Sequence, residues 1–230
     1  PERVVRDAEI QARTPRGTPV TLYFPPRMFP VPSHASEAYF EAIGDWYGQL
    51  APVVAPHVWP NGPVVLLQID NEAGYFFRNG PFCQDYHPDS IGAWHTFLET
   101  RHGSLHAAGE RHGRSYLAWA DAQPPRGWDV GKDVGKDGAI DPRRALCRQL
   151  DWAKFQEHLL TRAVDRMKRQ WFLVAPPVPT VHNLSLGDGG LPASPPAMAE
   201  AVDLVGFDYY HAAGSDSEAL RTIKRRTLYL

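Results

Sequence analysis

The hydrophobic positions along the chain follow two periods, one typical of helices and the other typical of strands. Within residues 36–54 apolar side chains recur at intervals of three and four, which predicts an amphipathic helix. The same spacing within residues 150–171 predicts a second amphipathic helix. Its apolar stripe is formed by Trp152, Phe155, Leu159, Ala163 and Met167.

Three shorter apolar runs lie between the predicted helices and have the length of strands. They cover residues 64–72, 179–184 and 202–210. A last helix is expected near the end of the chain, where Ser215 and Glu218 have the spacing of a capping box. Alternating strands and helices predict an α/β fold with parallel strands, either an open doubly wound sheet or a barrel. Periodicity alone does not separate these two architectures.

The stretch between the first strand and the second helix, residues 75–149, is too long for a plain connection. We expect an insertion with helices of its own over residues 91–100 and 105–112. Proline is abundant, with 22 residues in a chain of 230. Because proline interrupts helices and sheet ladders, its clusters mark the joints between these segments.

Composition and charge exclude several classes of protein. The formal net charge is −2, so the charge does not indicate a nucleic-acid-binding protein. No apolar stretch approaches the length of about 18 residues that a membrane helix needs. Cys83 and Cys147 are too few for a disulfide framework or a four-cysteine zinc site. The ten histidines contain no His-Glu-x-x-His pattern, and we expect no metal at His102 and His106 and no cofactor.

The first predicted strand changes character along its length. Val65, Leu67 and Ile69 form an apolar face, whereas the opposite face becomes polar toward Gln68, Asp70 and Glu72. Such a gradient suits the rim of a (β/α)8 barrel, where the carboxyl ends of the strands carry the chemistry. The alternative is a parallel strand that reaches solvent early.

The segment Gln68-Ile69-Asp70-Asn71-Glu72 resembles glycoside hydrolases in which an Asn-Glu pair ends the fourth strand of such a barrel. The nearest resemblance is to the β-galactosidases of families 42 and 35. Residues 24–33 look like the loop after the third strand in family 42, and residues 47–64 look like the helix that leads into strand four. Residues 101–105 resemble the insertion of that family.

The resemblance implies that residues 1–230 are the central part of a (β/α)8 TIM barrel. This part would comprise strands four to six with their helices and the helical insertion 75–149 after strand four. The ends of the barrel would lie outside the chain at both termini. The strand expected to carry the nucleophile would then lie beyond Leu230.

By this resemblance Glu72 is the general acid/base of a retaining hydrolase of β-galactosides or related β-glycosides. Retaining enzymes use two carboxyl groups about 5–5.5 Å apart, one as acid and one as nucleophile. Asn71 would offer its amide to the 2-hydroxyl of the sugar, a contact that strengthens in the transition state. The alternative function is a non-catalytic carbohydrate-binding barrel that kept the acid strand and lost the nucleophile.

Four further residues are candidates for substrate binding: Asn183 and Arg27 by the same resemblance, and Asp208 and Tyr210 because they share one face of the last predicted strand. For each of them a structural role stays open, as a turn residue, a hydrogen-bonded side chain or an exposed loop arginine. The expected partner is an oligosaccharide or glycoside substrate, with no nucleic acid and no membrane. The sequence leaves homo-oligomer formation open and assigns no compartment.

Overall fold

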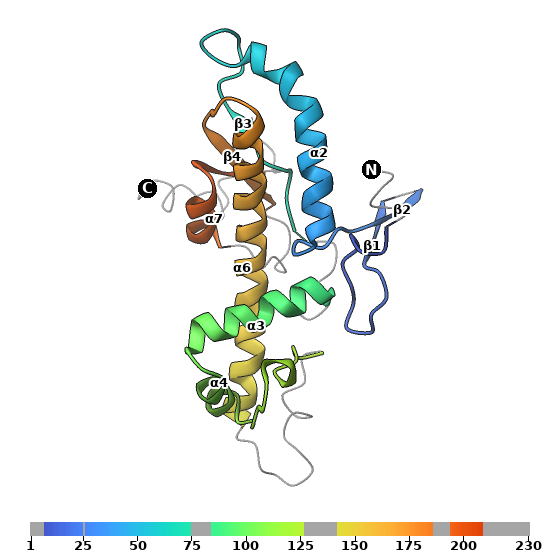
Figure 1. Ribbon diagram of the computed structural model, residues 1–230, viewed down its shortest axis with the longest axis vertical. Helices are drawn as coiled ribbons and strands as arrows, with labels where there is room; N and C mark the ends of the chain where they lie inside the picture. The colour runs from blue at the N-terminus through green and yellow to red at the C-terminus, as the bar shows by residue number, and fades with distance from the viewer. Residues whose placement is uncertain (1–6, 25, 75–83, 127–141, 186–193, 209–230) are drawn as a thin grey trace, which may run out of the picture.

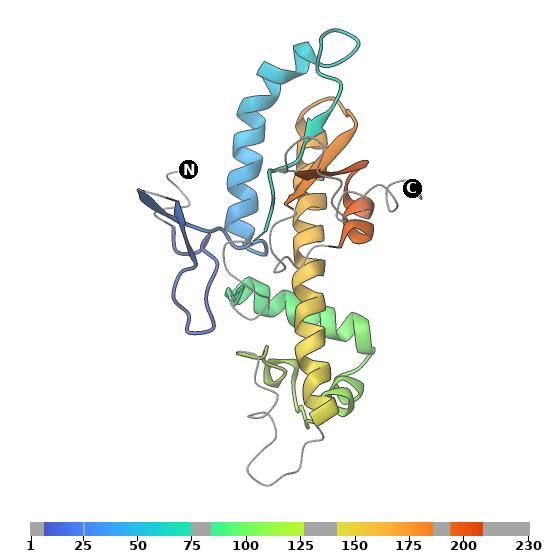
Figure 2. The same ribbon diagram turned by 180° about the vertical axis from the view of Figure 1, so that it is seen from behind.

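The computed structural model describes residues 7–24, 26–74, 84–126, 142–185 and 194–208. The molecule is elongated along the 33-residue helix α6, Pro142–Val174 (Figure 1). One end of α6 lies beside a small sheet and helix α2, and its other end lies among two shorter helices (Figures 1 and 2). The helix therefore connects two separate regions of hydrophobic packing.

The sheet consists of three parallel strands in the order β3-β4-β5. Its strands and the helix between the last two are β3 Leu67–Gln68, β4 Thr180–Ser185, α7 Pro195–Ala201 and β5 Leu204–Asp208. Helical segments lie between consecutive strands, as parallel pairing requires. The prediction of an α/β fold with three parallel strands is confirmed.

Helix α2, Glu37–Val54, lies against α6 and confirms the helix predicted for residues 36–54. It begins where the Ser36 side chain accepts a hydrogen bond from Tyr39 N, as an N-cap does. The face toward α6 buries Phe40 and Tyr47. Trp46, by contrast, is 58% exposed, so the interpretation of this residue as part of the apolar face, drawn from the spacing of three and four, is wrong.

The core between the sheet and the helices draws residues from every element of this region. Its buried members include Phe40, Ile69, Leu160, Val164, Met167, Leu184 and Met198. Ile69 is 1% exposed, so the apolar face of the first predicted strand does pack on the helices at this position. Val65 on the same predicted face is 59% exposed.

The second region packs two helices of the predicted insertion against the first half of α6. These are α3, Pro88–His102, and α4, Leu105–His112, and they are followed by the 3-10 turn η2, Trp119–Asp121. Both predicted insertion helices are confirmed. Helix α6 begins at Pro142 rather than near residue 150, so residues 142–149 belong to this helix.

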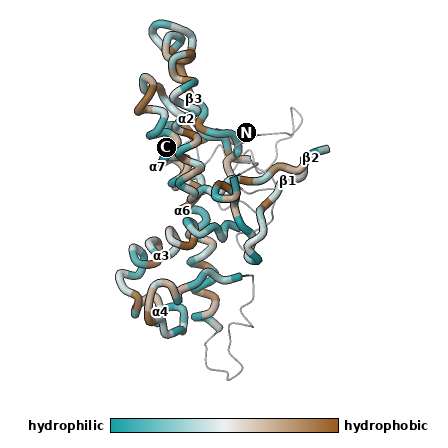
Figure 3. Tube along the Cα trace, turned by 45° about the vertical axis from the view of Figure 1, so that its right-hand side comes forward, coloured by the Kyte–Doolittle hydropathy of each residue, from teal (hydrophilic) through white to brown (hydrophobic). Residues whose placement is uncertain are grey.

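A cluster of aromatic side chains holds this second region together. Trp94, Trp152 and Phe155 are completely buried and lie within 5.6 Å of one another, measured between ring centroids. Fully burying side chains of this size stabilises a fold by several kcal/mol. Hydrophilic and hydrophobic residues are mixed along α3 and α4 (Figure 3), and the buried residues of α3, Ser90, Trp94 and Leu98, recur at intervals of four.

The N-terminal part of the described chain forms a hairpin. Strands β1, Thr21–Phe24, and β2, Arg27–Pro30, pair in antiparallel register. The expectation of a loop over residues 24–33 is therefore wrong for its first half. The residues of β1, Thr-Leu-Tyr-Phe, are of types that favour strands, and the local pairing partner is what converts them into one.

Within the described residues, no helix combines the length and the apolar character needed to cross a lipid bilayer.

Candidate active site

The polar segment after β3 does not continue as a strand. Ile69 N still donates to Val181 O at 2.8 Å, but Asp70 and Glu72 have φ values of 57° and 48°. These values lie in the left-handed region, where the alternation of a strand cannot persist. The predicted strand through Glu72 is therefore too long, and the chain turns at the edge of the sheet instead.

This turn brings three amide side chains together over the ends of β3 and β4. The Asn71 Oδ1 atom accepts hydrogen bonds from Gln68 Nε2 at 3.1 Å and from Asn183 Nδ2 at 3.0 Å. The Asn183 Oδ1 atom accepts from Gln68 Nε2 at 3.1 Å and from the backbone nitrogen of Glu72 at 3.0 Å. We call Gln68, Asn71 and Asn183 the amide network. Through Asn183, it fixes the backbone position of Glu72.

The amide network remains open toward solvent. Gln68 and Asn71 are exposed, and Asn183 and Glu72 are half-buried. Among the described residues, none accepts a hydrogen bond from Asn71 Nδ2. That donor is thus oriented by the network but available to a bound molecule.

A buried histidine supports the turn from beneath. The side chain of His182 is completely buried, and its Nδ1 lies 2.7 Å from the carbonyl oxygen of Ile69, to which it donates. Ile69 is therefore held to β4 through its backbone nitrogen and through its carbonyl oxygen. This double attachment comes directly before the segment that carries Asn71 and Glu72.

A second buried histidine, His34, lies near the carboxylates of Asp70 and Asp85. Burial lowers the pKa of His34, the charges of Asp70 and Asp85 raise it, and His182 lowers it further. Burial is the largest of these effects, so the neutral imidazole is the favoured form. The turn thus has a buried titratable group near it, in addition to the apolar core residues.

The charge of Asp70 also helps to raise the pKa values of two tyrosines of α2. Burial and then the negative charge of Asp70 raise the pKa of Tyr47 to about 12. The same two causes, followed by Tyr47, raise the pKa of Tyr39. The Asp70 carboxylate also accepts a hydrogen bond from Asn71 N at 2.8 Å, so it stabilises the turn of which it is part.

Asp85 is a completely buried carboxylate that organises the loop before α3. Its Oδ2 accepts hydrogen bonds from the hydroxyls of Ser33 and Ser90, and its Oδ1 accepts from the backbone nitrogens of Arg13 and His87. Four donors satisfy the charge of a buried carboxylate. Asp85 therefore joins the N-terminal segment to the insertion.

Among the remaining sequence-predicted candidates, no described contact joins Arg27 to the amide network. Arg27 is exposed at the end of the hairpin, which lies on the side of α2 away from the sheet (Figures 1 and 2). Asp208 is the last residue of β5 and is paired in register with Ser185 of β4. Tyr210 lies outside the described residues. Of the six candidates, Asn71, Glu72 and Asn183 are brought together.

Sequence reasoning missed the supporting role of His182 and the burial of His34 near Asp70. The signal for His182 was its place directly before Asn183 in a strand, because neighbouring residues of a strand point to opposite faces. One neighbour can thus reach the open edge while the other is buried. Nothing in the local sequence signals His34, whose surroundings come from distant segments.

The cluster of metal-binding residue types in the described part of the chain lies elsewhere. It consists of His102, His112 and Asp151, in the second packing region. It shares no residue with the amide network.

Comparison with known families shows to which family the chain belongs. The family model of glycoside hydrolase family 42, described as beta-galactosidase, matches residues 31–228. The chain belongs to glycoside hydrolase family 42.

Solved structures of β-galactosidases share the fold. The chain resembles the β-galactosidase of Rahnella sp. R3 with a TM-score of 0.67 and 18% identity, covering 99% of this chain and 30% of that one. It resembles the β-galactosidase of Bacillus circulans sp. alkalophilus with a TM-score of 0.66 and 16% identity, covering 99% and 30% of the two chains. At such identities the likeness shows the fold.

A curated relative is more similar in sequence. The exo-beta-D-glucosaminidase of Thermococcus kodakarensis is 26% identical over 175 residues, which are 71% of this chain and 20% of the relative. The family 42 chain described here therefore spans about a third or less of the length of these relatives.

Proposed function

We propose that this family 42 chain is the part of a (β/α)8 barrel that carries the acid/base half of a retaining glycosidase. In this proposal β3, β4 and β5 are strands four to six of the barrel. Residues outside the chain supply the other strands and the nucleophile. The β-galactosidase structures support this assignment, since the chain matches about 30% of their length.

The amide network is the single observation that carries the proposal. It lies where β3 and β4 end, which is the edge at which parallel barrels place their chemistry. It fixes the backbone of Glu72 and leaves Asn71 Nδ2 without an acceptor among the described residues. A carboxyl group beside an oriented amide donor is suited to protonate a glycosidic oxygen while the amide binds the neighbouring hydroxyl.

Each residue then has a role in the reaction. Glu72 donates its proton to the leaving oxygen, and its carboxylate later removes a proton from the attacking water. Asn71 donates from Nδ2 to the 2-hydroxyl, and Asn183 holds both Asn71 and the Glu72 backbone. The candidate contacts of Asp208, Tyr210 and Arg27 with the substrate remain part of the proposal.

The substrate class follows from the relatives. β-Galactosides are the first choice because the family description and the solved relatives name this activity. β-D-Glucosaminides are the second choice because the curated relative is an exo-beta-D-glucosaminidase. Comparing kcat/KM of the purified full-length protein on nitrophenyl β-galactoside and nitrophenyl β-glucosaminide separates the two.

Substitution Glu72→Gln in the full-length protein tests the acid/base role. Turnover of a natural disaccharide should fall by about 10²- to 10⁴-fold, the usual contribution of general acid catalysis. The first step with a nitrophenyl leaving group should be affected far less, because this group leaves without protonation. Azide should then restore turnover of the nitrophenyl substrate and yield a β-glycosyl azide, since two inversions retain the configuration.

A different outcome would support the alternative of a carbohydrate-binding barrel without catalysis. In that case the wild-type protein would bind galactosides, measured by calorimetry, but would hydrolyse none of them. Equal loss of both substrates in Glu72→Gln without azide rescue would remove the acid/base role from Glu72. Glu157→Gln on α6 is the control, because that carboxylate lies away from the sheet edge and pairs with Lys154.

A further inference from the structure

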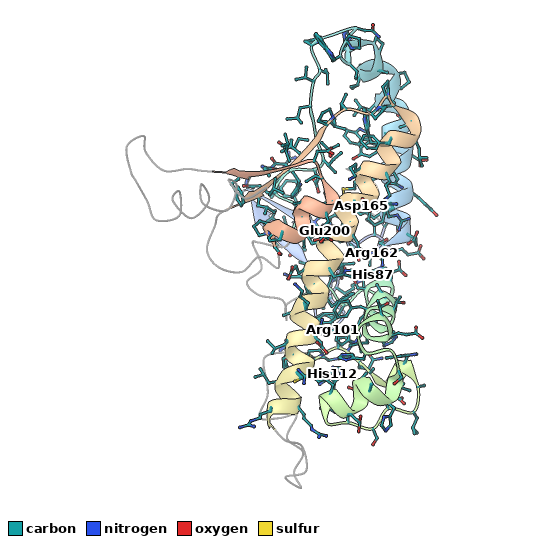
Figure 4. All side chains as sticks on the ribbon, turned by 90° about the vertical axis from the view of Figure 1, so that its left-hand side faces the viewer. His87, Arg101, His112, Arg162, Asp165 and Glu200 are labelled. Carbon is teal, nitrogen blue, oxygen red and sulfur yellow. The ribbon has the colours of Figure 1, made fainter. Side chains whose placement is uncertain are left out.

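Three helices bring two imidazoles and one carboxylate together at the end of α6 that lies away from the sheet. His102 is the last residue of α3, His112 is the last residue of α4, and Asp151 lies in the first part of α6. Their nitrogen and oxygen atoms lie within 4.8 Å of one another. Figure 4 shows Arg101 and His112 at this end of α6, whereas Asp165 and Glu200 lie nearer the sheet.

Both imidazoles are directed at the same carboxylate oxygen. The Nε2 atoms of His102 and His112 lie 2.8 Å and 3.0 Å from Asp151 Oδ2. The side chains are 12%, 0% and 6% exposed for His102, His112 and Asp151, respectively. The three groups are thus held in place by packing, and His102 leaves a narrow approach from solvent.

Two imidazole nitrogens and a carboxylate oxygen are a common ligand set for first-row divalent metals, zinc above all. Tetrahedral coordination with bonds of about 2.0–2.2 Å places neighbouring ligand atoms about 3.3–3.6 Å apart. The distances of 2.8 Å and 3.0 Å need to lengthen by less than 1 Å to admit the ion. Three protein ligands would leave the fourth position to water.

The neighbours of these three residues form hydrogen bonds with them, as the supporting residues of metal sites commonly do. His112 Nδ1 lies 3.0 Å from the hydroxyl of Tyr116, so an Nδ1–H bond to that oxygen frees Nε2 as a ligand. Arg101 Nε donates to Asp151 Oδ1 at 2.8 Å and leaves Oδ2 for the ion. Such partners fix the orientation of metal ligands.

The helix ends add a favourable field. His102 and His112 each end a helix whose C-cap is a glycine with positive φ, Gly103 and Gly113. The carboxyl end of a helix carries a partial negative charge that stabilises nearby cations. Two such ends lie beside a buried carboxylate, and Arg101 and Arg148 contribute positive charge nearby.

We propose that His102, His112 and Asp151 form a structural site for a divalent transition-metal ion, with Zn²⁺ as the best fit, which ties α3 and α4 to α6. The site is separate from the amide network, so its role is to hold the insertion together rather than to take part in glycoside hydrolysis. From the sequence no metal was expected, because His102 was paired with His106. His106 is 83% exposed and lies near Glu110 instead, so the fold gives His102 a different partner.

Metal titration of the full-length protein, purified without a histidine tag and stripped with EDTA, tests this proposal. Calorimetry should detect one Zn²⁺ per chain, and Zn²⁺ should raise the melting temperature of the stripped protein. His102→Gln and His112→Gln should each weaken Zn²⁺ binding by about 100-fold or more, because loss of a ligand costs at least as much as loss of a supporting group. His106→Gln, which changes an exposed histidine on the same helix as His112, should bind Zn²⁺ as the wild type does.

Absence of stoichiometric Zn²⁺ binding by the wild-type protein would overturn the site. Unchanged affinity in both His102→Gln and His112→Gln would overturn it as well. Because the wild-type titration is decisive by itself, the test does not depend on the folding of His112→Gln. The visible absorption of bound Co²⁺ gives a second readout, and it should change in His102→Gln but not in His106→Gln.

Discussion

The two packing regions along α6 both contain hydrogen-bonded polar groups, but they differ in exposure. The amide network at the sheet edge is open, with Gln68 and Asn71 exposed. Asp151, at the other end of α6, is buried, accepts a hydrogen bond from Arg101, and lies within hydrogen-bond distance of His102 and His112. An open network can exchange water for a ligand, whereas a closed network stabilises the elements that form it.

This difference implies that substitutions in the two regions should have different consequences. Changes near the aromatic cluster and Asp151 should lower stability and leave the chemistry intact in the molecules that remain folded. Changes in the amide network should lower catalysis and leave stability nearly intact.

Trp152→Ala should give the largest effect and should act on stability alone. Trp152 is completely buried against Trp94, Tyr86 and Phe155, and such truncations cost about 3–5 kcal/mol. Urea unfolding followed by circular dichroism measures the loss. Leu117→Ala, at a side chain that is 93% exposed, should change the free energy of unfolding by less than about 0.5 kcal/mol. A loss of kcat in Trp152→Ala without loss of stability would contradict the division into two regions.

Asn71→Ala should act on catalysis alone. Removing an oriented donor to the transition state typically lowers kcat by about 10²- to 10³-fold, or about 2.7–4 kcal/mol. The melting temperature should stay nearly constant because Asn71 is exposed. The control is Gln49→Ala, which removes an exposed amide from α2. If the melting temperature fell as in Trp152→Ala, the amide network would be a structural device.

His182 should connect the two kinds of behaviour, because it is buried yet holds the turn that carries Asn71 and Glu72. His182→Ala removes the donor to Ile69 O, and we expect kcat to fall about tenfold or more with little change in KM. His182→Asn should recover part of kcat, since its amide nitrogen lies near the position of the imidazole Nδ1. Equal kcat values in the two variants would mean that the hydrogen bond does not position the turn.

The smallest effect should come from protonation beneath the turn. Burial lowers the pKa of His34 below its ordinary value of 6.5, so the unfolded chain binds this proton more readily than the folded chain. The stability contributed by this group is therefore present above about pH 6.5 and decreases as the pH falls toward the lower pKa of the folded state. The total loss is about 1.4 kcal/mol for each pKa unit that separates the folded and unfolded states. The measurement is the free energy of unfolding across this range, and its slope should flatten in His34→Gln. An unchanged slope would assign the pH dependence to other histidines.

Hydrophobic spacing was sufficient to predict most helices and the parallel direction of the strands. The buried stripe Trp152, Phe155, Leu159, Ala163 and Met167 is confirmed in full, since each residue is at most 6% exposed. This succeeds because the face of a helix that packs is fixed by its own period. The parallel direction of β3, β4 and β5 follows from the same alternation of elements, whereas their order in the sheet was expected only from the resemblance to family 42.

The turn at Asp70 and Glu72 could not be read from the strand pattern. Their left-handed conformation depends on hydrogen bonds to β4, a strand more than a hundred residues later in the chain. The alternation rule placed Gln68, Asp70 and Glu72 on one face, whereas the turn joins Gln68 to Asn71 instead. A local sequence pattern describes one segment at a time, whereas this conformation depends on contacts between two distant segments.

The sequence by itself determined which residue types were available at the sheet edge, namely Asn71, Glu72 and Asn183, and the strand ends that bring them near one another. Only the tertiary structure decided that Asn183 would hold the Glu72 backbone, that His182 would be buried beneath Ile69, and that His102 would meet His112 rather than His106. The physical reason is that hydrogen bonds and metal-ligand sets depend on distances of a few ångströms between side chains. Such distances between remote segments are set by packing against α2 and α6, which no single segment of the sequence contains.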